Sequence, residues 1–439
     1  MQLKTNNVLS HRHALLFFLI VIVIGLSLRL TYLNWGLPYI HHPDEPINLS
    51  IVHRMVKQAD LNPRAFFYPS LLYYAALPGQ FIVRAMDGQL AEFSMQSMGT
   101  GWLRQPASLL AARITIVIVG LALIAAVILW VVRVFETPWL GVLTGTLVAF
   151  NPILVRHSTY FTPDQLSALF ATLALFGASL IVMRGQRWNY MFAGVMAGLA
   201  ASSKYNAGLV AVAIAVAHWQ RCGFKIRHAA PLFVAALASC AALLITSPFL
   251  LLDMDSAHRG IASVLTHYSS GHGGAEGDSL AYKATWLFQL TGATGIAIAG
   301  LLLDSRARPL LPAAVFSVLY FLLLASQEVR FERNIMPIIP AILVLAAGGL
   351  YVIVGRPSTP ALRAVAVGLF LLAYVGPLSR TVSGLASSEQ DDRAGARVWL
   401  QRLLPRDATV AVEAYAPYLT GFTRLRPLGS RLALNSDSR

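Results

Sequence analysis

The chain has 439 residues, of which 56% are hydrophobic and only 12% are charged, and its formal net charge is +14. Soluble domains contain about 25% charged residues, so this composition argues against a soluble enzyme and indicates a membrane protein. The Lys and Arg residues lie mostly in short gaps between apolar runs, as the positive-inside rule expects. A nucleic-acid-binding protein would instead gather them in a patch on a soluble fold.

Long apolar runs predict several membrane-spanning helices, because one helix needs about 20 apolar residues to cross the bilayer. The first run, 14–33, is longer than the apolar part of a signal peptide, and no small-residue cleavage pattern follows it. We therefore expect a retained anchor with a cytoplasmic N-terminus. The clear spans are predicted at 14–33, 109–132, 138–155, 165–183, 229–247, 285–303, 309–325, 335–354 and 361–378.

The apolar segment 71–86 is short and contains Pro78 in its middle. Arg133 and Arg184 follow two later spans, and both should be cytoplasmic. Both arginines can be cytoplasmic only if 71–86 does not cross the membrane, so we expect this segment to lie in the outer membrane interface. The whole of 34–108 then forms one external loop with interfacial helices.

The segment 188–219 lies between two basic clusters, so both of its ends should be cytoplasmic. It predicts a hairpin of two short helices whose apex, at Lys204, approaches the outer side. A lysine at this depth is costly and usually functional. The alternative is a lysine whose side chain extends to the outer interface. With this hairpin the expected total is about eleven spans.

Beyond residue 379 the composition becomes that of a soluble segment, with an amphipathic helix, a turn and a strand. We therefore divide the chain into a transmembrane catalytic domain, 1–378, and a short external C-terminal segment, 379–439. The predicted fold class is an all-α polytopic membrane protein with external juxtamembrane helices.

On this topology the unusual polar residues collect on the external side. Asp44 is the best candidate for a general base that takes a proton from an acceptor hydroxyl, with Glu45 as its partner and Asp164 as the second acid. Asp44 and Asp164 each precede a helical pattern, so each could instead be an N-cap. Separated cations suit a lipid-linked phosphate leaving group, whose developing charge they would stabilise.

Further candidates come from the external loops. The candidate contacts to the donor lipid phosphate are Lys204, Arg330, Arg333, Arg64 and Tyr68, and the candidate substrate contacts are His267, His272 and Arg156. The external histidines match no strong metal-ligand spacing. We name no metal ligand, and metal dependence is left open.

Several stretches, taken in order, resemble a known family. They are HPDEPINLSIVHRM, NPRAFFYPSLLYY, NPILVRHSTYFTPDQLSALFATLALF, GLAASSKYNAGL, RFERNIMPIIPAILVL and ARVWLQRLLPRDATVAVEAYAPYL. The chain resembles polyprenyl-phosphate-dependent glycosyltransferases of the GT-C type, in the protein O-mannosyltransferase and aminoarabinose transferase superfamily. The resemblance implies a GT-C-like fold, inversion at the sugar C1 and a donor that is not a nucleotide-sugar, and no obligatory metal is established for this branch.

The resemblance also implies roles for individual residues. Asp44 matches the acid of the first external loop, Asp164 the acid of the second, and Lys204 the lysine of a Gly-Leu-x-x-x-x-Lys stretch. Arg333 falls at the basic position before a Pro-x-x-Pro span, with Arg330 as a rival. Asn334 departs from the family pattern, since an aromatic residue is common at its position.

The function expected from these features is that of an integral membrane glycosyltransferase. It would transfer a hexosyl or pentosyl group from a polyprenyl-phosphate donor to a hydroxyl on a lipid, glycan or protein acceptor. The expected location is the plasma (inner) membrane, with the active site on the external or periplasmic face and a role in the cell envelope. The alternative is a membrane transporter or lipid flippase, in which intramembrane charges would line a pathway. Transporters often show repeated halves with interrupted helices, and the sequence shows no such repeat.

Overall fold

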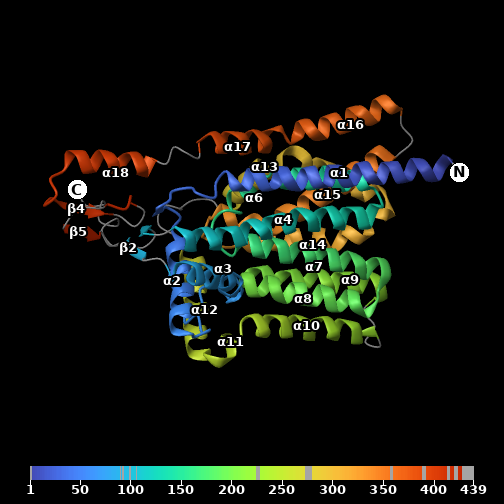
Figure 1. Ribbon diagram of the computed structural model, residues 1–439. Helices are drawn as coiled ribbons and strands as arrows, with labels where there is room; N and C mark the ends of the chain where they lie inside the picture. Colours follow the sequence, from blue (N-terminus) through green and yellow to red (C-terminus); the bar gives the residue numbers. More distant parts are fainter. Residues whose placement is uncertain are drawn as a thin grey trace, which may run out of the picture.

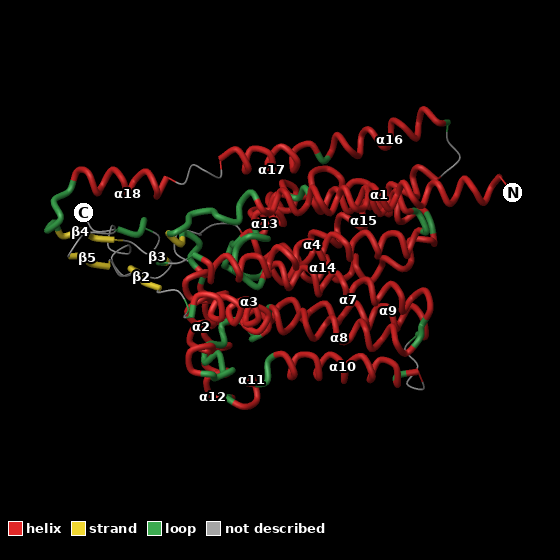
Figure 2. The backbone as a smooth tube through the Cα atoms, viewed as in Figure 1, coloured by secondary structure: helices red, strands yellow, loops and turns green. Residues whose placement is uncertain are grey.

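The computed structural model describes residues 2–88, 90, 93–97, 100–104, 106–223, 228–271, 279–355, 359–387, 392–412, 416–419 and 424–427. Long, nearly parallel helices form a bundle, and shorter helices lie across one of its ends (Figure 1). The N-terminus lies at the opposite end. The strands are confined to the end with the shorter helices, as Figure 2 shows.

The bundle is built from eleven α-helices and four short 3-10 helices of the described chain. The α-helices are α1 (Gln2–Leu30), α4 (Ala107–Phe135), α5 (Pro138–Ala149), α7 (Asp164–Arg184), α8 (Arg187–Ser203), α9 (Ala211–Cys222), α10 (Ala230–Thr246), α13 (Ser279–Thr291), α14 (Leu311–Ala325), α15 (Ile339–Gly355) and α16 (Pro360–Ala373). The 3-10 helices are η1 (Tyr205–Val210), η3 (Gly292–Leu303), η4 (Ser305–Leu310) and η5 (Glu332–Ile338).

Seven helical segments of the described chain are long and apolar enough to cross a membrane. They are His13–Leu30, Ala107–Phe135, Asp164–Arg184, Ser279–Leu301, Ala307–Ala325, Glu332–Gly355 and Pro360–Leu385. Two shorter apolar helices are α5 and α10. The predicted class, an all-α polytopic membrane protein, is therefore confirmed, whereas the total of eleven spans is not.

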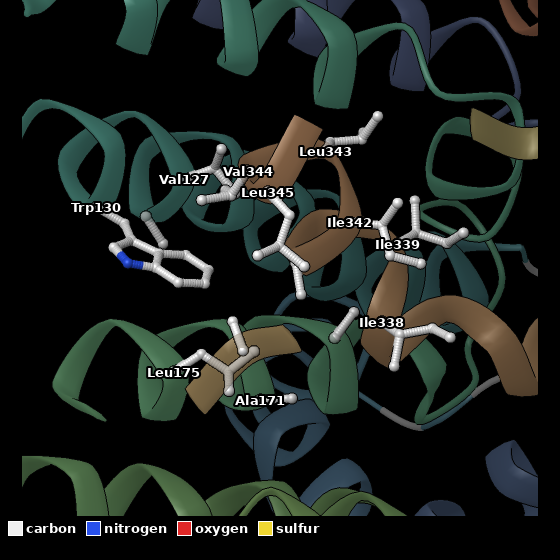
Figure 3. Close-up of a cluster of buried hydrophobic side chains, with 14 of the residues drawn as sticks. Val127, Trp130, Ala171, Leu175, Ile338, Ile339, Ile342, Leu343, Val344 and Leu345 are labelled. Atoms are coloured by element: carbon white, nitrogen blue, oxygen red, sulfur yellow. The ribbon is translucent and has the colours of Figure 1, made fainter. Parts of the chain in front are cut away.

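The bundle core is formed by apolar side chains of α4, α7 and α15 (Figure 3). Within it, the indole Nε1 of Trp130 donates a hydrogen bond to Oγ of Ser179 at 2.9 Å, which satisfies its one polar atom. Helices α8 and α10 pack with their backbones in close contact. A Cβ on Gly194 or Gly198 would lie 2.2 Å from a backbone carbonyl oxygen of α10, so only glycine allows this packing.

The end of the bundle opposite the N-terminus carries the external elements of the prediction. Its helices are α2 (Asp44–Gln58), α3 (Leu71–Asp87), α6 (Pro152–Arg156), α11 (Phe249–Leu252) and α12 (Met254–Ser270). Helix α3 forms where a non-spanning helix was predicted, and it packs against α2 and α4. A small antiparallel sheet in the first loop was not predicted; its strands are β1 (Tyr39–Ile40), β2 (Phe93–Ser97) and β3 (Thr100–Leu103).

The C-terminal segment returns to this same end. Helix α17 (Val375–Ser387) follows α16 along the outside of the bundle, and α18 (Asp392–Leu403) lies beyond the bundle end (Figure 1). The predicted strand forms as β4 (Thr409–Val412), which pairs in parallel with β5 (Arg424–Pro427). The first loop and the tail therefore lie at one end of the molecule, as the count of crossings predicted.

Candidate active site

The two acids singled out in the sequence each begin a helix. Asp44 is the first residue of α2 and Asp164 the first of α7, and the N-cap of each helix is the preceding proline. A carboxylate in the first helical turn is stabilised by the helix dipole. Neither carboxylate serves as an N-cap, because their side chains bind Tyr68 and Lys204 instead. The capping alternative is therefore wrong for both.

Arg333 bridges the two carboxylates. Its Nη1 lies 2.9 Å from Oδ2 of Asp44, and its Nε lies 4.0 Å from Oδ2 of Asp164. Lys204 binds the other oxygen of Asp164, with 2.7 Å between Nζ and Oδ1. Two acids and two cations that are far apart in the sequence thus form one continuous network.

Lys204 reaches this network because the hairpin bends at its own position. Helix α8 ends at Ser203, and Lys204 is extended before η1 begins. Its Nζ also donates to Oδ1 of Asn334 at 2.7 Å, and the side chain is only 6% exposed. The ammonium group is therefore bound inside the protein, and the alternative of a lysine that extends to the interface is wrong.

Two further residues, hydrogen-bonded to this network, were not assigned a role from the sequence. Oδ1 of Asn334 accepts hydrogen bonds from Lys204 at 2.7 Å and from the hydroxyl of Tyr268 at 3.3 Å. Tyr268 comes from α12, which crosses the end of the bundle. A shared amide acceptor of this kind gives no signal in the sequence, because it depends on where three distant segments meet.

A cavity of about 990 Å³ lies next to the network. Its polar lining includes Asp44, Tyr68, Lys204, Arg330 and Arg333. Its apolar lining includes Phe67, Ile261, Val264 and Leu265 of α12, and Leu323 of α14. The cavity can therefore hold a ligand that has an anionic head and an apolar chain.

The hydroxyl of Tyr68 donates to Oδ2 of Asp44 at 3.2 Å. Burial, reinforced by the charge of Asp44, raises the pKa of Tyr68 well above its ordinary value. Tyr68 therefore stays protonated and remains a donor. It was predicted as a phosphate contact, and in the structure it both lines the cavity and orients Asp44.

The rings of His42, His157 and Tyr160 form a cluster near Asp44. The ring centroids of His42 and Tyr160 are 4.5 Å apart, and those of His157 and Tyr160 are 5.3 Å apart. Burial lowers the pKa of both histidines, that of His157 well below its ordinary value, so both are neutral near pH 7. His157 lines the cavity but was not among the predicted site residues. Its neighbour Arg156 was predicted instead, because Arg156 carries a charge.

Glu45 does not lie in the cavity. It is fully buried, and its two oxygens accept hydrogen bonds from Nε and Nη2 of Arg113 at 2.8 and 2.7 Å. The backbone N–H of Phe161 donates to the same carboxylate at 2.9 Å. Arg113 in turn donates to the carbonyl oxygens of Leu33 and Trp35. Glu45 therefore ties the first loop, α4 and the second loop together.

The remaining predicted residues are divided between the cavity and the surface. Arg330 and His267 line the cavity, and the guanidinium of Arg330 lies 5.2 Å from the ring centroid of Tyr282. Arg64 is instead paired with Asp60 at 2.9 Å on the surface. Arg156 is paired with Glu332 at 2.8 Å and does not line the cavity. His272 lies outside the described residues.

A buried lysine holds the loop that carries the arginines. Nζ of Lys283, in α13, donates to Oγ of Ser279 at 2.5 Å and to the carbonyl oxygens of Leu324 and Gln327. A cation at these carbonyls suits the C-terminal end of α14. Lys283 therefore fixes the start of the segment that leads to Arg330 and Arg333.

No group of three or more His, Cys, Asp and Glu side chains that could hold a metal ion is found in the part of the chain that the structure describes. The histidines predicted as substrate contacts give no cluster there either.

Comparison with known proteins adds a family and a fold. Residues 104–251 match the family model described as dolichyl-phosphate-mannose-protein mannosyltransferase. This segment contains both Asp164 and Lys204. Comparison with curated protein sequences gives no match.

The fold is similar to that of solved membrane proteins. The apo structure of ArnT from Cupriavidus metallidurans gives a TM-score of 0.60 at 15% identity, over 92% of this chain and 82% of that chain. ArnT bound to undecaprenyl phosphate gives 0.61 at 14% identity, over 95% and 86%. The Archaeoglobus fulgidus oligosaccharyltransferase, in a complex with Zn and sulfate, gives 0.52 at 15% identity, over 94% and 62%. At these identities the likeness establishes a shared fold.

The predicted resemblance therefore has two independent supports, one in the sequence and one in the fold. Residues 104–251 match the mannosyltransferase family model and the chain shares the fold of ArnT, so both comparisons agree with the predicted GT-C resemblance.

Proposed function

We propose that the protein transfers a sugar from a polyprenyl-phosphate-linked donor to an acceptor hydroxyl, with inversion, on the external face of the membrane. The observation that carries the proposal is the network Asp44–Arg333–Asp164–Lys204 beside a cavity whose lining also includes apolar side chains of α12 and α14. The complex of ArnT with undecaprenyl phosphate supports a lipid-linked donor for a protein of this fold.

The donor phosphate would lie against Arg333 and Arg330. Both line the cavity, and an arginine can bind a phosphate through two parallel N–H groups. As the bond from C1 to the phosphate oxygen breaks, negative charge grows on the phosphate, and preorganised cations stabilise it. Lys204 would act mainly through Asp164 and Asn334, which already bind its ammonium group.

Asp44 would be the general base. Its side chain is 21% exposed, whereas that of Asp164 is 1% exposed, so an acceptor entering the cavity can reach only the first. Arg333 holds Asp44 in place through their ion pair. When a donor phosphate binds Arg333, that ion pair would weaken, and Asp44 would be able to accept the proton of the acceptor hydroxyl.

Asp164 would position the cations. Oδ1 accepts from Lys204, and Oδ2 has no hydrogen-bond partner among the described residues but lies 4.0 Å from Arg333. Buried Asp164 would therefore hold Lys204 at one carboxylate oxygen and Arg333 near the other. The apolar residues of α12 and α14 would then receive the first isoprene units of the lipid.

The rival function, transport, fits the distribution of buried charges less well. Three buried cations lie close to the cavity: Arg29 donates to Oγ of Ser158, which follows the cavity residue His157, Lys204 lines the cavity, and Lys283 donates to the carbonyl oxygen of Gln327, which also lines it. A pathway across the membrane would need polar groups along its length. The described core of α4, α7 and α15 is apolar instead.

The experiment that tests the proposal is transfer of sugar from a radiolabelled polyprenyl-phosphate sugar by the purified protein. Asp44→Asn keeps the shape of the side chain but removes the base, and it should lower kcat at least about 100-fold. Asp60→Asn, an acid of the same loop that is paired with Arg64 outside the cavity, should have the parental rate. If Asp44→Asn transfers sugar at the parental rate, Asp44 is not the base.

A further inference from the structure

A second cavity, about 430 Å³ in volume, lies between the turn 31–41 and α18. Ala394 and Arg397 of α18 form one side of it, and the turn forms the other. None of the residues described as lining it lines the active-site cavity. Its volume is in the range of ligand pockets, and nothing in the proposed reaction uses it.

Arg397 is the charged residue of this cavity. Its Cζ lies 3.4 Å from the ring centroid of Tyr39, so the guanidinium is stacked on the ring. Stacking fixes the plane of the guanidinium and leaves the N–H groups on its edge available. Nη1 is buried and has no hydrogen-bond partner among the described residues. A buried donor in this state is costly unless an acceptor binds it.

Other contacts fix the turn and α18 on either side of Arg397. One turn earlier in α18, Nη1 of Arg393 donates to the carbonyl oxygen of His41 at 2.7 Å, and its Cζ lies 5.8 Å from the ring centroid of Trp35. Gly36 has a φ of 79°, and a Cβ there would lie 2.7 Å from Cδ2 of His41. The turn is thus packed tightly, and α18 is docked on it by two arginines.

We propose that this cavity is a binding site for a phosphate or carboxylate group, carried by a small polar molecule or by a lipid headgroup. Arg397 would bind two oxygens of the anion through its N–H edge, and the amide of Asn34, which also lines the cavity, would lie beside them. The described lining contains no Asp or Glu, so an anion meets no like charge there. Because α1 ends at Leu30, the cavity lies where a predicted span leaves the bilayer, at the depth of lipid headgroups.

The test measures binding to the purified full-length protein in nanodiscs. One arm titrates glucose 6-phosphate at constant ionic strength by calorimetry, with nanodiscs of phosphatidylcholine. The other arm measures retention of phosphatidylglycerol by native mass spectrometry, with mixed nanodiscs. Arg397→Gln should weaken binding at least tenfold in one arm, and that arm identifies the source as a soluble phosphate or a lipid. Arg402→Gln, an exposed arginine of the same helix, should change neither arm.

Arg397→Gln could also release α18, so a second variant decides that case. Asn34→Ala leaves the stacking of Arg397 intact and should weaken the same arm several-fold. Asp44→Asn should leave binding unchanged, so a failure of the glycosyltransferase proposal does not affect this one. The proposal is overturned if Arg397→Gln binds both probes like the parent at an unchanged melting temperature. It is equally overturned if Arg397→Gln loses stability and Asn34→Ala binds both probes like the parent.

Discussion

Nζ of Lys204 lies 2.7 Å from Oδ1 of Asp164, and both side chains are buried. This pair joins the apex of the α8–α9 hairpin to the first turn of α7. It is thus a structural contact as well as part of the candidate active site, and the two roles can be separated by experiment.

Lys204→Met should destabilise the protein by about 3–5 kcal/mol, because removal of one partner leaves a buried charge without its counterion. The double variant Lys204→Met, Asp164→Asn should recover part of this loss, since both charges are then removed. Denaturant unfolding in detergent, with tryptophan fluorescence as the signal, measures the difference. Equal stability of the single and double variants would show that the unpaired charge of Asp164 does not cause the loss.

Glu45→Gln should affect stability more than chemistry. The carboxylate is fully buried on Arg113, so its neutralisation should cost about 3–5 kcal/mol. Because Glu45 does not line the cavity, the folded variant should keep kcat within a few-fold of the parent. Rates per folded molecule, measured at low temperature, check this. A 100-fold loss of kcat without loss of stability would restore the catalytic role that the sequence suggested.

Lys283→Met should act on donor binding. The variant loses the hydrogen bonds that hold the carbonyls of Leu324 and Gln327, and the segment that carries Arg330 and Arg333 loses its support. A loss of about 1.5 kcal/mol, the lower end for a hydrogen bond to a charged group, would raise KM for the donor about tenfold while kcat changes less. Lys57→Met, an exposed lysine of α2, is the matched control. An equal effect of both variants would rule out this positioning role.

Stability should fall as the pH decreases below about 6.5. His157 and His42 have lowered pKa values in the folded protein, because both are buried. The unfolded chain therefore binds more protons below its ordinary histidine pKa, and each histidine can reduce stability by up to about 1.4 kcal/mol per pH unit. Asp44 and Asp164 partly oppose this shift, whereas Arg156 and Arg333 reinforce it at one or both rings.

Melting temperatures measured between pH 8 and pH 5 test whether stability falls as the pH decreases. His157→Gln should flatten the profile, since it removes one of the two groups, and His258→Gln, at an exposed position of α12, should not. A parental profile in His157→Gln would show that another group controls the acid limb.

The sequence was most informative where the membrane imposes a rule. Apolar length predicted the long helices, and basic residues between them predicted which ends lie together, so that the first loop and the tail meet at one end. The same count grouped Asp44, Asp164, Lys204 and Arg333 before any contact was known. The network among these four bears out the grouping, while their catalytic roles remain a prediction.

The sequence was less informative where the outcome depends on neighbours. Glu45 is adjacent to Asp44, yet on a helix consecutive side chains point in different directions, and Glu45 points to Arg113. Arg64 lies in the right loop but turns to Asp60 on the surface. Asn334 and Tyr268 could not be found, because hydrogen-bonded amides and hydroxyls leave no periodic or charged pattern.

The network of two carboxylates and two cations has a further electrical consequence. The two carboxylates and two cations together carry no net charge. In the proposed reaction, a phosphodiester monoanion becomes a phosphate dianion while Asp44 takes up a proton, so the total charge of the site stays constant through the chemical step. Each elementary charge moved across the membrane couples to about 2.3 kcal/mol per 100 mV. In the proposed step negative charge moves only from Asp44 to the phosphate in the same cavity, so we expect sugar transfer to depend only weakly on the membrane potential.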